Sequence, residues 1–171
     1  MAITVDTDTY ISLADAETYT AENYLYTDRK RVEWNKLLDN EKEILLRRAA
    51  KVIDRQPLIG IKAVSTQDME FPRAIHTDYK RRDLPILNTH FYSDWYIQTE
   101  TPDAVKHAQV EIALTATQDA PKRVELQRQG VKSFSLGKLS ESYGSGSNNA
   151  IVSHEARELL KPYLAGSVSI C

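Results

Sequence analysis

Two short runs of the chain combine basic and aromatic side chains, the residue types that hold single-stranded nucleic acids. The run at 29–31 (Arg-Lys-Arg) precedes Trp34, and Tyr79 precedes the run at 80–82 (Lys-Arg-Arg). Aromatic rings stack on bases, while Arg and Lys attract phosphates. Acidic residues flank both runs and weaken that attraction, so solvated surface charge is the favoured interpretation of both. These acidic residues are Asp28, Glu33, Asp78 and Asp83.

Residues that could form a catalytic or metal centre do not occur at the required spacing. None of the four histidines has a second histidine or a cysteine at metal-ligand spacing. The glycine-rich segment 144–147 (Gly-Ser-Gly-Ser) is not followed by the lysine that a phosphate-binding loop requires. No Gly-x-Ser-x-Gly motif presents a nucleophilic serine. The sequence therefore predicts no enzyme activity, no metal site and no cofactor.

The overall charge and length narrow the classes of protein. A total of 22 Lys and Arg against 24 Asp and Glu gives a net charge of -2, which argues against a protein that coats DNA. A length of 171 residues suits one domain with one core. The single cysteine cannot form an internal disulfide, so we expect a reducing compartment. Apolar runs are only a few residues long, which predicts no membrane anchor.

The charges are unevenly ordered along the chain. Residues 1–27 contain five acidic and no basic side chains, whereas residues 28–55 contain nine basic and six acidic ones. This order favours neighbouring helices that attract one another, or a surface of two signs. The simpler interpretation is that these charged side chains are ordinary solvated surface residues.

Helix-capping signals and apolar spacing predict most of the secondary structure. Ser12 begins a helix that ends near Tyr26, and a second helix spans residues 29–38. Asp39 or Asn40 caps a third helix, which Pro57 stops. Further helices follow Thr101-Pro102-Asp103 and Ser153. Residues 58–101 show no sustained hydrophobic periodicity, so we expect irregular structure there.

The predicted fold is mainly α: an antiparallel helical bundle with a β-hairpin insertion and an extended C-terminal tail. Residues 1–164 form its single domain. Within it, we expect a long aromatic-rich loop or insertion at 75–100, the hairpin at 130–143 and a flexible Gly/Ser loop at 144–149. The tail comprises residues 165–171.

The order of these elements and several short motifs are similar to those of one viral protein family. The segments that carry the resemblance are 10–19, Trp34, 37–43, 46–54, 69–73 (Met-Glu-Phe-Pro-Arg, with an aromatic-Pro-Arg triplet), 102–116, 131–143 and 159–164. They resemble the head–tail connector proteins of tailed bacteriophages, also called adaptor or head-completion proteins. Some members of that family are labelled DnaT-like single-stranded-DNA-binding protein.

The resemblance implies a structural virion protein of the neck, assembled in the host cytoplasm. Copies of the chain would form a homo-oligomeric, dodecameric ring between the portal protein and the tail or downstream neck protein. The ring would extend the channel through which double-stranded DNA passes without specific binding. Few phosphate contacts on the channel wall would leave the DNA mobile.

The resemblance also implies roles for three sets of residues. The tail would dock into the portal by adding a strand to a partner sheet, although a frayed terminus is the alternative. Its residues are Ser167, Val168, Ser169, Ile170 and Cys171. Candidates for the ring interface are Asp15, Glu17, Glu22, Arg29, Arg31, Arg47 and Arg48. Candidates for contact with the neck or tail protein are Tyr92, Trp95 and Tyr96.

Two other functions stay open at this point. The first is single-stranded-DNA binding or a primosomal accessory role, which follows the other family label and predicts affinity that falls steeply with salt. The second is a small enzyme whose site residues are not grouped by sequence spacing. It would require a buried polar cleft with strongly shifted titratable groups.

Overall fold

The computed structural model describes residues 3–76, 89–92, 95–117, 133–136, 139–142 and 151–165, and only the backbone within 89–92, 133–136 and 139–142. About half of this described part is helical. Its five α-helices are α1 (Leu13–Asn23), α2 (Arg29–Asn35), α3 (Asp39–Asp54), α4 (Asp103–Ala116) and α6 (His154–Leu160), and a 3-10 turn, η1 (Lys161–Tyr163), follows α6. None of the described helices is long and apolar enough to cross a bilayer.

Side-chain caps begin three of these helices, as the sequence predicts. Ser12 accepts a hydrogen bond from the N–H of Asp15 (3.1 Å), and Asp28 and Ser153 cap α2 and α6 in the same way. These contacts satisfy backbone donors that have no partner inside the helix. The start of α3 differs, because the N-cap is Leu38, whose N–H donates to the Glu41 carboxylate (2.8 Å).

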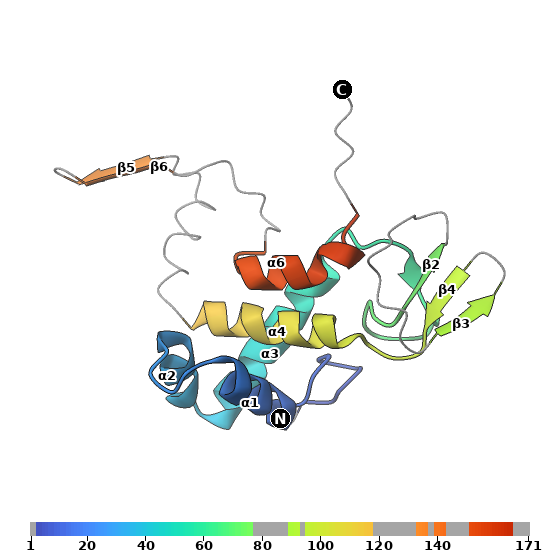
Figure 1. Ribbon diagram of the computed structural model, residues 1–171, viewed down its shortest axis with the longest axis horizontal. Coiled ribbons are helices and arrows are strands. Elements are labelled where there is room, and N and C mark those ends of the chain that lie inside the picture. Colours follow the sequence, from blue (N-terminus) through green and yellow to red (C-terminus); the bar gives the residue numbers. More distant parts are fainter. Residues whose placement is uncertain are drawn as a thin grey trace.

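Helix α4 lies at the centre of the helical part (Figure 1), where it packs against both α3 and α6. The first core cluster joins α3, α4, α6 and η1 around the buried rings of Tyr10, Phe71 and Tyr163. The second cluster joins α1, α2 and α3 to the C-terminal half of α4 around Trp34. Because α4 contributes to both clusters, seven of its 14 residues are buried.

Residues 58–101 contain a β-sheet, so the expectation of irregular structure there was wrong. The sheet is antiparallel with the order β1-β2-β4-β3 and lies at one end of the helical part (Figure 1). Its strands are β1 (Ile61–Lys62), β2 (Arg73–His76), β3 (Thr89–Tyr92) and β4 (Trp95–Gln98). Strands of two to four residues are too short for a period of two to stand out in a sequence.

The guanidinium group of Arg73 attaches this sheet to the segment that follows α3. Arg73 is buried, and its Nε and Nη2 donate to the carbonyls of Ile59 (2.7 Å) and Gly60 (2.7 Å). Its Nη1 donates to the Glu70 carboxylate (2.6 Å). The aromatic-Pro-Arg triplet of residues 71–73 therefore has a structural role, because a buried charge needs this full set of partners.

The architecture is mixed α/β, which corrects the prediction of a mainly α helical bundle. The hairpin within 130–143 is present, since β5 (Ser133–Leu136) pairs antiparallel with β6 (Leu139–Ser142). The predicted Gly/Ser loop at 144–149 lies outside the described residues, and so does the tail from residue 166 onward.

Gly60 provides a test of the attachment between sheet and helices. Its φ is 75°, and a Cβ atom added there would lie 2.2 Å from the carbonyl oxygen of Ala74. We expect Gly60→Ala to lower the free energy of unfolding by about 2 kcal/mol or more, because it adds a clash to an unfavourable backbone conformation. Urea unfolding followed by circular dichroism measures this change. Arg48→Ala, at an exposed site on α3, is the control, and an equal effect of both substitutions would contradict the prediction.

Candidate nucleic-acid interface

Strands β2 and β4 present different residues on their two sides. In the register, Ile75 pairs with Tyr96, and both side chains are buried against Ile59. Because neighbouring residues of a strand point to opposite sides, the alternating residues lie on the other side of the sheet. We call this side the outer face; on these two strands it comprises Ala74, which is buried, and His76, Trp95 and Ile97, which are partly exposed.

An aromatic pair occupies the outer face. His76 and Trp95 are cross-strand partners, and their rings meet edge to face with centroids 5.1 Å apart. Both side chains are partly exposed. The backbone register also places Tyr92 of β3 opposite Trp95. Partly exposed rings on neighbouring strands of a sheet, as those of His76 and Trp95, are suited to stacking with bases.

Two of the three basic residues in the run at 29–31, Lys30 and Arg31, contact other parts of the chain. Lys30 donates to the carboxylate of Glu111 (3.2 Å), and Arg31 donates to the Tyr24 carbonyl (2.8 Å). Trp34, which the sequence pairs with this run, is 1% exposed and cannot stack on a base. The run at 80–82 lies outside the described residues; in the sequence it falls between β2 and β3.

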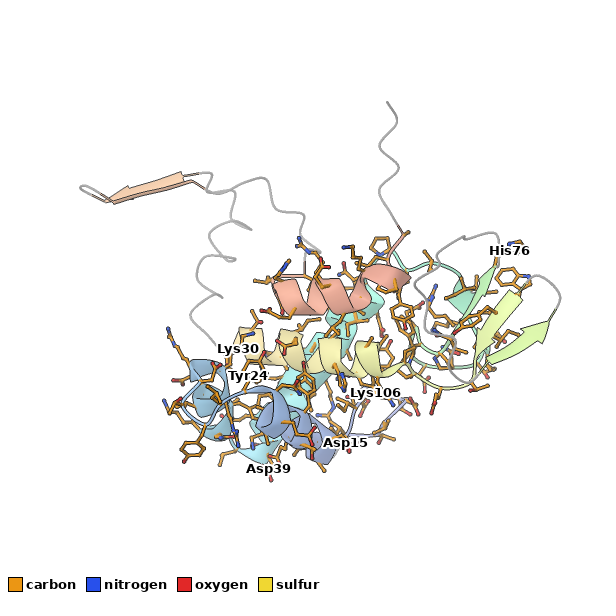
Figure 2. The ribbon with its side chains drawn as sticks, in the orientation of Figure 1. Asp15, Tyr24, Lys30, Asp39, His76 and Lys106 are labelled. Carbon is orange, nitrogen blue, oxygen red and sulfur yellow. The ribbon has the colours of Figure 1, made fainter. Side chains whose placement is uncertain are left out.

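Glu111 forms a buried polar network between α4 and the first two helices. Its side chain is 2% exposed and accepts hydrogen bonds from the hydroxyls of Tyr19 (3.0 Å) and Tyr24 (2.5 Å). Lys30 completes the network, and Figure 2 shows Lys30 and Tyr24 together, far from His76. Burial, reinforced by the hydrogen bonds to Glu111, raises the pKa of both tyrosines well above the usual value. The sequence analysis did not identify Glu111 as a buried residue. Its position among the apolar residues of α4 could have indicated this.

A second buried polar side chain on α4 holds the N-terminal segment. Gln109 is fully buried; its Oε1 accepts from the N–H of Tyr10 (2.9 Å) and its Nε2 donates to the hydroxyl of Thr9 (2.6 Å) and to the Leu46 carbonyl (2.9 Å). The Tyr10 hydroxyl donates to Asp54, whose pKa is raised by burial. The hydrogen bonds of Gln109 and Tyr10 thus join the N-terminal segment to α3 and α4. In the ranges that the structure describes, no cluster of three metal-ligating side chains occurs.

Most of the residues predicted for a ring interface make contacts within the chain. These contacts are Asp15 with Ser12 (2.6 Å), Glu17 with Lys42 (2.7 Å), Arg31 with the Ala21 carbonyl (3.1 Å) and Arg47 with Asp8 (3.5 Å). Five of the seven predicted residues are nevertheless exposed: Asp15, Glu17, Glu22, Arg29 and Arg48. Part of the acidic and basic charge that the sequence separates is thus paired inside one protomer.

The three aromatic residues predicted to contact another neck or tail protein lie in different environments. Trp95 is partly exposed on the outer face, whereas Tyr96 is 8% exposed and packs in the sheet's own small core. Tyr92 belongs to β3, of which only the backbone is described. The tail predicted to dock into a portal, Ser167 to Cys171, lies outside the described residues.

Comparison with known proteins decides between the two family labels. Residues 2–171 match the family model described as "Putative DnaT-like ssDNA binding protein". The chain belongs to this family. No curated protein and no solved structure matches the chain.

Membership of the DnaT-like family corrects the connector interpretation. The head–tail connector assignment, and with it the virion adaptor ring, was wrong, because the matching family is described by single-stranded-DNA binding. The motifs that suggested a connector are largely structural: Phe71 and Trp34 lie in the core, and Arg73 attaches the sheet. Such motifs specify packing and do not distinguish functions built on similar folds.

Removing the carboxylate of Glu111 tests the buried network. Glu111→Ala leaves two phenols without their shared acceptor and leaves Lys30 only its longer pair with Glu155 (3.8 Å). Loss of one partner of a buried pair costs about 3–5 kcal/mol. We expect the free energy of unfolding in urea to fall by about 3 kcal/mol or more. Lys36→Ala removes an exposed pair with Glu33 (2.9 Å) and should change it by less than about 1 kcal/mol. A similarly small change in Glu111→Ala would contradict the role of the network.

The pH dependence of stability gives a second test of the same network. Tyr19 and Tyr24 have pKa values above that of an unfolded tyrosine, near 10. Their contribution to stability is therefore complete below about pH 10 and is lost as the pH rises toward their folded pKa values. We expect the urea midpoint to fall above about pH 10 and to fall less in Tyr24→Phe. Tyr26→Phe, at a 77% exposed residue, is the matched control; equal pH profiles in all three proteins would refute the assignment.

Proposed function

We propose that this protein binds single-stranded DNA on the outer face of its sheet, without catalysing a reaction. The observation that carries the proposal is the edge-to-face pair of His76 and Trp95, partly exposed on neighbouring strands. The description of the family supports the same ligand. Stacking on an aromatic side chain contributes about 1–3 kcal/mol per base and tolerates any sequence, because every base has a π-face.

The apolar neighbours of this pair favour bases over phosphates as the groups in contact. Ile97 is the residue two positions after Trp95 on β4 and is also partly exposed, so the surface continues along the strand. Among the described residues at the sheet, Lys62 and Arg73 both pair with Glu70. In the sequence, the basic run at 80–82 falls between β2 and β3. Any cation that contacts DNA phosphates releases counterions, so we expect binding to weaken as salt rises.

A different aromatic and basic contact, at the turn between α1 and α2, is the competing surface. Tyr26 is 77% exposed, and the Arg31 guanidinium lies 5.7 Å from the centre of its ring. We favour the sheet because it offers two rings in contact, whereas Tyr26 offers one. The association of several copies of the chain is untested and stays a prediction.

The two tryptophans allow the proposed surface to be tested by intrinsic fluorescence. Trp34 is buried and Trp95 is partly exposed, so quenching by a bound base would come from Trp95. We expect titration with an oligothymidylate to quench the wild-type protein and Trp34→Phe, but not Trp95→Phe. In fluorescence anisotropy with a labelled oligonucleotide, Trp95→Ala should weaken binding about 5- to 150-fold, which corresponds to the loss of one stacked base.

The matched control is Tyr26→Ala, which removes the competing ring and should leave the affinity nearly unchanged. A loss of affinity in Tyr26→Ala but not in Trp95→Ala would move the interface to the turn between α1 and α2. Absence of oligonucleotide binding by the wild-type protein at low salt would contradict the proposed function itself.

A further inference from the structure

Three cations lie in a row on the exposed side of α3. Arg48, Lys51 and Arg55 are all exposed, and their spacing of three and four residues places them on one side of the helix. Arg55 is the C-cap of α3 and keeps helical φ and ψ angles of -83° and -4°. At a rise of about 1.5 Å per residue, the row is about 10 Å long. We call these three residues the basic stripe.

The side chains of the basic stripe have no partner in the part of the chain that the structure describes, where they make no hydrogen bond, ion pair or ring contact. Every other described lysine or arginine has a partner. The acidic residue next to Arg55 in the sequence, Asp54, accepts the hydrogen bond of the Tyr10 hydroxyl. The charge of the stripe is therefore available to an anion from outside the chain.

The dipole of α3 explains only part of this row. The carbonyl groups at the C-terminal end of a helix favour cations within the last turn. Lys51 lies in the last turn of α3 and Arg55 follows it, whereas Arg48 precedes that turn. Side chains of the same charge also repel one another at this spacing, so the row is unfavourable by itself. An anionic ligand would relieve this repulsion.

We propose that the basic stripe binds phosphate groups of the single-stranded DNA whose bases stack on the outer face of the sheet. This inference rests on the proposed function and adds a surface for the DNA backbone. The planar fork of donors on an arginine matches a phosphate, and a lysine adds a point charge. Phosphates of one strand are about 3.4 Å apart along the axis of B-DNA, so a row of about 10 Å spans a few of them.

The stripe also lies near the sheet along the chain. The segment from Arg55 to Ile61 of β1 can span at most about 22 Å, because an extended residue covers no more than about 3.6 Å. One end of the stripe is therefore within reach of a DNA strand that is bound at the sheet.

The salt dependence of oligothymidylate binding tests the stripe directly. A stripe variant that combines Arg48→Gln, Lys51→Gln and Arg55→Gln removes three charges and keeps side chains that favour a helix. For single strands, the logarithm of the association constant falls with the logarithm of the salt concentration by about 0.7 per phosphate contact. We therefore expect this slope to be shallower by about 2 in the stripe variant. Its affinity should be about 100-fold weaker at about 0.1 M salt and nearly equal to that of the wild-type protein at about 1 M. An unchanged slope in a variant with the circular dichroism of the wild-type protein would overturn the proposal.

The matched control removes three cations that have acidic partners within the chain. It combines Lys36→Gln, Lys106→Gln and Lys161→Gln, whose lysines pair with Glu33 (2.9 Å), Asp103 (2.9 Å) and Glu158 (3.1 Å). The stripe variant and this control have the same net charge. We expect the control to keep nearly the wild-type slope, because its lysines are already neutralised by their partners. An equal loss in both variants would show that net charge alone attracts the DNA and would overturn the proposal.

An oligomer of abasic deoxyribose phosphates separates the stripe from the aromatic surface, because it offers phosphates without bases. It should bind the stripe variant more weakly than the wild-type protein and bind Trp95→Ala as well as the wild-type protein. If the stripe variant binds both oligomers normally while Trp95→Ala loses affinity for oligothymidylate, the stripe is refuted and the surface on the sheet stands. If the stripe variant loses affinity for both oligomers and Trp95→Ala for neither, the stripe stands and the aromatic surface is refuted.

An acidic segment of another protein is the alternative occupant of the stripe, and decaglutamate serves as its probe. We expect decaglutamate to bind the wild-type protein more weakly than an abasic oligomer of equal charge, because the forked donors of two arginines match phosphates. Tighter binding of decaglutamate, lost in the stripe variant, would assign the stripe to an acidic protein and overturn the proposal.

Discussion

The burial of two polar side chains on α4 is the constraint on which the helical part depends. Gln109 and Glu111 lie within the best-covered helix of the fold, where an unpaired polar group costs several kcal/mol. Each is satisfied by groups far away in sequence: Tyr10 and Thr9 for Gln109, and Tyr19, Tyr24 and Lys30 for Glu111. Hydrogen bonds are directional, so these partners fix where α1, α2 and the N-terminal segment lie. Apolar packing is not directional and could not fix these positions as narrowly.

The sheet depends on a second buried polar group, the guanidinium of Arg73. By donating to carbonyls at residues 59 and 60 and to Glu70, Arg73 joins β2 to the chain that leaves α3. This attachment gives β4 two different sides. One side closes against Ile59 and Ile75, and the other carries Trp95 with the ring of His76. The proposed DNA surface is therefore a consequence of how one short strand is held.

The sequence was informative about the helices and poor about the sheet. Caps such as Ser12 and Ser153 act within four residues, so their effect is readable locally. The sheet was missed because its strands have at most four residues and their pairing joins residues about twenty positions apart. The family resemblance failed in a related way: its motifs at residues 34, 71 and 73 mark core positions, and core positions do not distinguish a connector from a DNA-binding protein.

The sequence by itself determined the helical segments, their polarity and the hairpin at 130–143, because these depend on neighbours along the chain. It also named Trp95 as one of a group of aromatic residues without saying which of them are buried. The tertiary structure decided that Tyr96 faces the core while Trp95 faces outward, and that Lys30 neutralises a buried carboxylate. It alone buried the Tyr163 hydroxyl without a hydrogen-bond partner among the described residues. Burial and long-range pairing set these outcomes, and neither is encoded in the spacing of residues along the chain.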